Sequence, residues 1–123
     1  MWQIDEHPQK TAFSYLELPV SRMGPDGKVW APDERVDRVT ILKAATSWAS
    51  EYVLRPDNIG TLEKGKWADF LVLNQDYFTI PEQEISEVHP LMTVVGGDIV
   101  YLDPAFAQEI GQQPVGYQHA GLR

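Results

Sequence analysis

The sequence predicts an α+β fold in which two short helices are followed by a few β-strands. Between residues 36 and 55, apolar residues recur at three- and four-residue steps, the spacing of a helix with one apolar face. Between residues 56 and 102, short apolar runs alternate with Gly and Pro, which is typical of strands joined by turns. We therefore divide the chain into an irregular arm (1–35), a helical segment (36–55), a β-rich segment (56–102) and a C-terminal tail (103–123).

The helical segment is interrupted near its middle. Thr46 and Ser47 are poor residues for a helix interior but good caps, so we expect two short helices at 38–45 and 47–54, or one helix bent there. Pro56 ends the helical part because it disfavours helical geometry in the residue before it. The apolar stripe consists of Val36, Val39, Leu42, Ala45, Ala49 and Tyr52.

The arm before the helices has little periodicity. Ala12 to Leu18 alternates roughly and is expected to be a short strand or an extended arm, ended by Pro19. Met23 to Lys28 is a turn by composition, because Pro and Gly supply the dihedral angles of a tight reversal. Asp33 or Asp37 can cap the following helix by accepting hydrogen bonds from its free amides.

The β-rich segment begins with two predicted strands. Ile59 to Leu62 is read as a short strand, and Glu63 to Lys66 as a turn in which Gly65 is free to take a positive φ. Ala68 to Asn74 has a continuous apolar centre, which predicts a strand buried on both faces.

A hairpin is predicted at the end of this segment. Ile80 to Glu87 is polar with one or two apolar anchors and is expected to form a helical turn. The runs Leu91 to Val95 and Ile99 to Leu102 are joined by Gly96-Gly97-Asp98, a glycine-supplied turn between two strands. The tail after Asp103 is rich in Gly, Pro and Gln and is interpreted as an arm or as disorder.

Composition limits the choice of partners. Apolar residues make up 43% of the chain, with four Trp, five Tyr and four Phe, which is not the composition of a disordered protein. A core drawn from roughly two-thirds of so small a chain would gain from a partner. Eighteen acidic against ten basic residues give a net charge of −8, which argues against nucleic acid and anionic membranes because both need a basic face.

Several kinds of chemistry are excluded by residue content. The chain has no Cys, so disulfides, thiolate metal sites and cysteine nucleophiles are absent. Ser14 and Ser47 have no His–Asp context and are not nucleophile candidates. No apolar signal core begins the sequence, and no run is long enough to span a bilayer.

Four blocks of sequence resemble one family. Residues 59–73 read IGTLEKGKWADFLVL, which is similar to the segment I-G-[ST]-[IL]-x-x-G-K-x-A-D-[LF]-[VL]-[VL]-[LW] of the amidohydrolase superfamily. Three further blocks follow the family's order: ILKAAT at 41–46, DYFTIP at 76–81 and TVVGGDIVY at 93–101. The combination most resembles the branch of formamide deformylase-like and other exoenzyme-regulatory amidohydrolases.

The resemblance implies an architecture larger than this sequence. In the family a (β/α)8 barrel carries the active site, and a small composite β-sandwich is built from both chain ends. The two helices would come from the end of the barrel and the strands would form part of the sandwich, so the fold would be incomplete alone. Gly60 and Gly65 would serve turns, while Lys66 and Asp69 would flank the buried strand where it meets solvent.

The resemblance also implies a catalytic set that we do not find here. The family uses a His-x-His pair, a bridging Lys or Glu, two further His and an Asp ending strand eight. These groups hold one or two divalent ions, commonly zinc, which lower the pKa of a bound water. His7, His89 and His119 form neither His-x-His nor a helical His pair, and the setting of Asp5 is unlike the usual S-D-x-P strand end. We therefore assign no catalytic, cofactor-binding or metal-binding residue to this chain.

The remaining polar candidates have structural interpretations that we favour. Asp5, Glu6 and His7 have the chemistry of a weak carboxylate–imidazole metal site, but a solvated loop is the preferred interpretation. His89 stands at a strand start and is interpreted as a boundary residue. His119 lies in the Gly-rich tail, where disorder is favoured over engagement by another subunit.

Aromatic residues offer a second set of candidates. Trp30, Trp48 and Trp67 can be read as a ligand platform, but packing in the core or against a barrel is favoured. The loop from Met23 to Asp33 is a weaker candidate for reaching a substrate in an intact enzyme, as βα loops do in barrels.

The combined hypothesis is the C-terminal portion of a metal-dependent hydrolase acting on non-peptide carbon–nitrogen bonds, inactive alone and cytoplasmic. Its expected partner is the missing N-terminal barrel portion or a second copy in a homo-oligomer. Without that partner, the chain is expected to have exposed apolar patches and open sheet edges. The alternative is a non-catalytic, free-standing interaction module or decayed gene product that pairs with a separate chain. A third hypothesis is a small metal enzyme that uses Asp5, Glu6 and His7.

Overall fold

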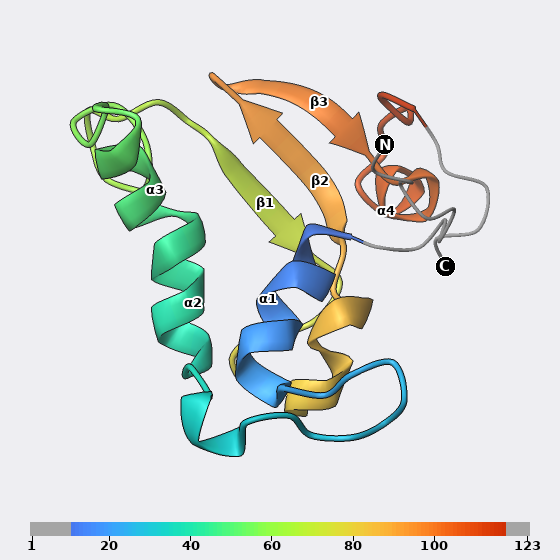
Figure 1. Cartoon of the computed structure of the whole chain (residues 1–123). Coiled ribbons are helices and arrows are strands. Elements are labelled where there is room, and N and C mark those ends of the chain that lie inside the picture. The colour runs from blue at the N-terminus through green and yellow to red at the C-terminus, as the bar shows by residue number, and fades with distance from the viewer. Residues whose placement is uncertain (1–10, 118–123) are drawn as a thin grey trace, which may run out of the picture.

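The computed structural model describes residues 11–117. Helices α2 and α3 form one side of the molecule, the sheet lies in the middle and α4 lies on the other side (Figure 1). The helices and strands are, in chain order, α1 (Ala12–Ser21), η1 (Pro32–Glu34), α2 (Arg38–Ala45), α3 (Ser47–Tyr52), β1 (Phe70–Leu73), η2 (Glu82–Glu87), β2 (Pro90–Val95), β3 (Asp98–Leu102) and α4 (Pro104–Glu109).

The sheet is antiparallel with the order β1-β2-β3. Phe70 lies opposite Val94, and Met92 lies opposite both Val72 on β1 and Leu102 on β3. The turn between β2 and β3 places Gly96 and Gly97 at positive φ, 59° and 88°. The predicted hairpin is therefore confirmed.

The main core lies where α1 packs against η2 and the segment leading into it (Figure 1). Its buried members are Phe13, Val20, Tyr77, Ile85 and Val88. A hydrogen bond supplements this apolar contact, because the Ser86 amide donates to the Glu17 carboxylate at 2.7 Å. This core joins residues that are far apart in the sequence.

A reciprocal pair of hydrogen bonds ties α2 to the core. The Tyr77 hydroxyl donates to the carbonyl of Arg38 at 2.8 Å. The Arg38 guanidinium donates back to the carbonyls of Tyr77 and Ile80, each at 2.8 Å. Burial raises the pKa of the Tyr77 phenol, and the nearby Arg38 charge opposes that shift. The phenol is therefore a stable neutral donor.

The helical segment follows the prediction closely. Asp37 caps α2 by accepting from the Thr40 amide at 2.9 Å, and the Thr40 hydroxyl and amide hold the pKa of the Asp37 carboxyl below its usual value. The break between α2 and α3 falls at Thr46, whose hydroxyl donates to the carbonyl of Leu42 at 2.7 Å. The turn at Met23 to Lys28 is also confirmed, with a hydrogen bond from the Gly27 amide to the Gly24 carbonyl at 2.9 Å.

Two expectations for the chain ends are wrong. Ala12 to Leu18 is neither a strand nor an extended arm, because α1 covers it and continues through Pro19 to Ser21. The segment after Asp103 is not wholly irregular either, since α4 begins at Pro104. The Asp103 carboxylate caps that helix by accepting from the amides of Ala105 and Phe106.

Two expectations for the β-rich segment are also wrong. Ile59 to Leu62 forms a bend rather than a strand. The strand predicted over 68–74 is confirmed only at Phe70–Leu73, and it is not buried on both faces, since Leu71 is 48% exposed. The helical turn predicted over 80–87 is confirmed as η2.

Within residues 11–117, no helix has the length and apolar character needed to cross a bilayer.

The Tyr77–Arg38 pair leads to a stability prediction. Tyr77→Phe removes the hydroxyl that satisfies the Arg38 carbonyl, so we expect the free energy of unfolding to fall by about 1 kcal/mol. Urea denaturation followed by circular dichroism measures the change. Tyr52→Phe is the matched control, because Tyr52 is 89% exposed and its loss of a hydroxyl is expected to cost less than about 0.5 kcal/mol. Equal effects of the two substitutions would contradict the assignment.

Candidate functional site

The candidate site is the loop from Ile59 to Asp69 together with the elements it contacts. Gly60 has a φ of +96° and lies against α3. A Cβ placed on it would lie 2.5 Å from the Ser50 Oγ and 3.2 Å from the Thr46 carbonyl oxygen. Such an approach is possible only without a side chain, so Gly60 joins the loop to the helix.

The Lys66 side chain joins two other residues of the same loop. Its ammonium donates to the Thr61 hydroxyl at 2.7 Å and lies 3.5 Å from the Glu63 carboxylate. The Lys66 side chain is only 16% exposed, so the expectation that it stands where the strand meets solvent is wrong. The Glu63–Lys66 turn itself is confirmed, with Gly65 at a φ of +97° and nothing near its Cα that a methyl group would meet.

Asp69 ties the loop to the hairpin. Its carboxylate accepts a hydrogen bond of 2.6 Å from the Gly96 amide. The Gly97 amide donates to the carbonyl of Ala68 at 3.0 Å, so consecutive residues of the turn are held by consecutive residues before β1. This arrangement fixes the β2–β3 turn against the start of β1.

Trp67 lies beside the same turn. It lines an open depression of about 300 Å³ with Ala68 and Gly96, and the Arg55 guanidinium carbon lies 5.9 Å from its ring centroid. The Trp67 amide donates to the Asn58 carbonyl at 2.8 Å, which holds the end of the loop against its beginning. The depression has an aromatic wall and no acidic or hydroxyl group among its lining residues.

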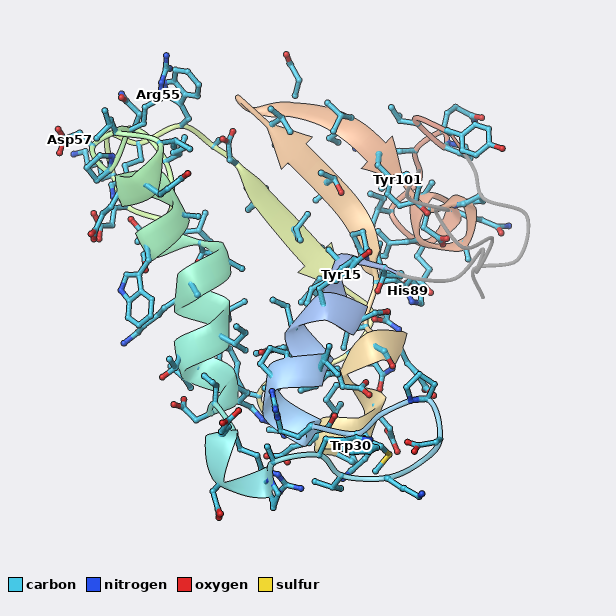
Figure 2. The ribbon with its side chains drawn as sticks, in the orientation of Figure 1. Tyr15, Trp30, Arg55, Asp57, His89 and Tyr101 are labelled. Carbon is cyan, nitrogen blue, oxygen red and sulfur yellow. The ribbon has the colours of Figure 1, made fainter. Side chains whose placement is uncertain are left out.

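The three tryptophans do not form a platform. Trp30 lies in the loop at one end of the molecule, whereas Arg55, which contacts Trp67, lies at the opposite end (Figure 2). Trp30, Trp48 and Trp67 are each about half exposed, so they do not pack in a core of the described residues. The alternative, that they pack against a barrel, stays a prediction. Whether the loop from Met23 to Asp33 reaches a substrate stays a prediction.

Of the polar candidates, only His89 lies in the part of the chain that the structure describes. Asp5, Glu6, His7 and His119 lie outside the described residues. The His89 amide donates to the Asn74 Oδ1 at 2.9 Å. Its ring Nδ1 lies 3.1 Å from the carbonyl oxygen of Glu87, which fits the boundary role predicted for it.

A divalent metal needs several ligands at one point, and the described residues do not provide them. Between positions 11 and 117, no three His, Asp or Glu side chains gather closely enough to hold an ion. The side chains of residues 11–117 therefore do not fit the family's metal.

Comparison with known families decides the ancestry of this arrangement. The sequence profile of the amidohydrolase family matches residues 10–101. The chain belongs to the amidohydrolase family. The match includes the loop, the hairpin and the helices that carry Ser50 and Arg38. Neither the curated proteins nor the solved structures gave a match.

The amidohydrolase segment contains contacts that sequence reasoning missed. Ser50, buried on α3, is the residue that Gly60 approaches, and Arg38 is the partner of Tyr77. The sequence has only a weak signal for the Ser50 contact. Ser50 is small and lies one turn after Ser47, so its side chain leaves room for the backbone of another segment to approach the helix. No sequence signal indicates the pairing of Arg38 with residues about forty positions away.

A matched pair of substitutions tests the Gly60 contact. Gly65→Ala is expected to cost about 1–2 kcal/mol of unfolding free energy from positive φ alone. Gly60→Ala has the same dihedral penalty and must also displace Ser50, which adds about 1–3 kcal/mol. Chemical denaturation of both variants gives the difference. If Gly60→Ala is no worse than Gly65→Ala, the loop does not touch α3 as described.

The Asp69 carboxylate is tested by a second pair. Asp69→Ala leaves the Gly96 amide without its acceptor, and we expect a loss of about 1 kcal/mol together with a shift of the Gly96 amide resonance. Asp69→Asn keeps an acceptor oxygen and should lose less. Asp98→Ala removes an exposed acid at the other end of the turn and serves as the control. An unmoved Gly96 resonance in Asp69→Ala would rule out the contact.

Proposed function

We propose that this chain is the C-terminal, non-catalytic portion of a metal-dependent amidohydrolase that cleaves non-peptide carbon–nitrogen bonds. In this proposal the chain supplies the last barrel helices and part of the composite β-sandwich. The barrel that holds the ions and carries out hydrolysis is supplied by another portion or another polypeptide. The formamide deformylase-like branch and a cytoplasmic location are part of the same proposal.

The roles of the motif residues support the non-catalytic part of the proposal. Gly60, Lys66 and Asp69 each make a contact inside the chain that accounts for the residue type. Lys66 and Asp69 are the ionisable residues of the loop with the best defined partners, and both are used in joining the loop and the hairpin. These contacts indicate that the loop has a structural role, in which it connects α3 to the β2–β3 hairpin.

Uncovered apolar side chains support the existence of a partner and are the observation that carries the proposal. Along α2, α3 and the residues that follow, apolar side chains face solvent: Val39, Trp48, Tyr52, Val53 and Leu54 are 44 to 89% exposed. Leu54 is 87% exposed and has a φ of +59°, a conformation that is costly for a branched side chain. Large apolar side chains exposed in this number along one segment are typical of an interaction site.

The free-standing module is the second candidate, and the same exposed surface favours it. The two hypotheses differ in where the partner is encoded. A continuous reading frame upstream of Met1 that encodes His-x-His and a strand-eight Asp supports the enzyme portion. A stop codon and a promoter there would favour a separate module and contradict the first proposal.

Metal content gives a direct biochemical test. After incubation with excess zinc and desalting, we expect the isolated chain to retain well under one ion per molecule by elemental analysis and to hydrolyse no N-formyl or N-acyl substrate. Stoichiometric zinc with amide hydrolysis would overturn the proposal. In that case His7→Ala, with His89→Ala as the control, would show whether Asp5, Glu6 and His7 form the site.

A further inference from the structure

Strand β3 lies at one edge of the sheet, and a later segment of the same chain covers part of that edge. Leu102, at the end of β3, forms an isolated antiparallel bridge with Val115. The Leu102 amide donates to the Val115 carbonyl at 2.9 Å, and the Val115 amide donates back to the Leu102 carbonyl at 3.3 Å. Such a reciprocal pair is typical of two antiparallel strands. Val115 therefore stands where a fourth strand would pair with β3.

Helix α4 returns the chain to this position. The Asp103 amide donates to the Leu91 carbonyl at 2.8 Å, which fixes the start of the helix to β2. Ala107 is fully buried, and its carbonyl accepts from the Gln112 amide at 2.8 Å where the helix ends. The helix lies beside the end of β3 (Figure 1). We call the following residues, 110–117, the C-terminal strap; they lie after the part of the chain that matches the family profile.

Gly116 allows the strap to lie directly on the backbone of β3. Its φ is +81°, and a Cβ placed on it would lie 2.5 Å from the Val100 carbonyl oxygen and 3.4 Å from the Tyr101 Cα. Two backbones that approach this closely leave no room for a side chain, so the contact itself requires glycine. Gly111 also has a positive φ, +70°, but a Cβ placed on it would meet no atom within 4 Å.

The composition of β3 shows why this edge needs a cover. Its residues 99–102 contain no charge and no Pro, and Val100 is 45% exposed. Natural sheets protect such an edge with Lys, Pro, a bulge, or a covering helix or loop, because an uncovered edge pairs with strands of other chains. Of these devices, the strap supplies the covering loop.

We propose that the C-terminal strap closes the β3 edge, so that a strand from another chain can pair there only after the strap has detached. No strap residue belongs to the core around Tyr77, so the strap can detach while that core stays folded. The Val115 side chain is 36% exposed, which leaves the backbone contacts as the main attachment that this residue makes. The proposal does not depend on the assignment as an enzyme portion.

Two glycine substitutions in the full chain test the attachment of the strap. Gly116→Ala must push the strap away from β3, whereas Gly111→Ala has a similar dihedral penalty and meets no atom. We expect the Leu102 amide to exchange at least about tenfold faster in Gly116→Ala than in Gly111→Ala. The Asp103 amide, which donates to Leu91 of β2, should stay protected in both variants. If Gly116→Ala does not fold, Val115→Pro opens the strap by removing the amide that donates to Leu102.

An open β3 edge should also cause association. Light scattering after gel filtration should give a higher mass for Gly116→Ala than for Gly111→Ala at equal concentration, where one chain has 13.9 kDa. Adding Val100→Lys to Gly116→Ala should restore the mass of the unsubstituted chain, because Lys on an edge strand opposes strand addition. Leu62→Lys adds the same charge at a loop position that is 75% exposed, and it should not restore that mass.

Three results would overturn the proposal. Equal exchange of the Leu102 amide in the two glycine variants would mean that the strap does not rest on β3. Fast exchange in Gly116→Ala without a higher mass would mean that the strap does not protect the edge. Restoration by Leu62→Lys as well as by Val100→Lys would mean that the chains associate through another surface.

Discussion

The packing of α1 against η2 around Tyr77 is the interaction on which the rest of the structure depends. It brings Phe13 and Val20 to Ile85 and Val88, and the Tyr77–Arg38 hydrogen bonds attach α2 to the same point. The helices and the sheet otherwise share few contacts. Without this core, the α2–α3 arm and the hairpin would be connected mainly by the loop between them.

That loop explains why the most recognisable part of an amidohydrolase sequence contains no acid, base or metal ligand with an evident catalytic task. Gly60 fits against Ser50, Lys66 closes the loop, and Asp69 holds the hairpin turn. The residue types are fixed by contacts between the helical and β parts. The segment therefore identifies the family by the contacts that it makes between the helical and β parts. Apolar side chains stay exposed on α2 and α3, and in the proposed function they form the surface that a partner covers.

Local signals in the sequence predicted the elements that depend on local physics. The Asp37 cap, the break at Thr46 and the glycine turn of the hairpin followed from caps and dihedral preferences. Pro19 indicates the end of an element, yet helix α1 continues through it, and the spacing of Phe13, Leu16 and Val20 fits one helical face. Helix α4 was missed despite Asp103 and Pro104, a capping residue followed by a first-turn proline. The contacts of Arg38 and Ser50 could not be predicted, because they depend on tertiary packing and not on neighbours in sequence.

Amide hydrogen exchange on the isolated chain tests most directly whether the α1–η2 core holds the molecule together while its flanks stay uncovered. The slowest exchange should be found in α1, in β2 and around Ile85 and Val88. Exchange in α3 and in the loop up to Trp67 should be far faster, because those amides open without disturbing the core. Equal protection of α3 and α1 would mean that the chain buries its own apolar surface, and the account of a structural portion awaiting a partner would be wrong.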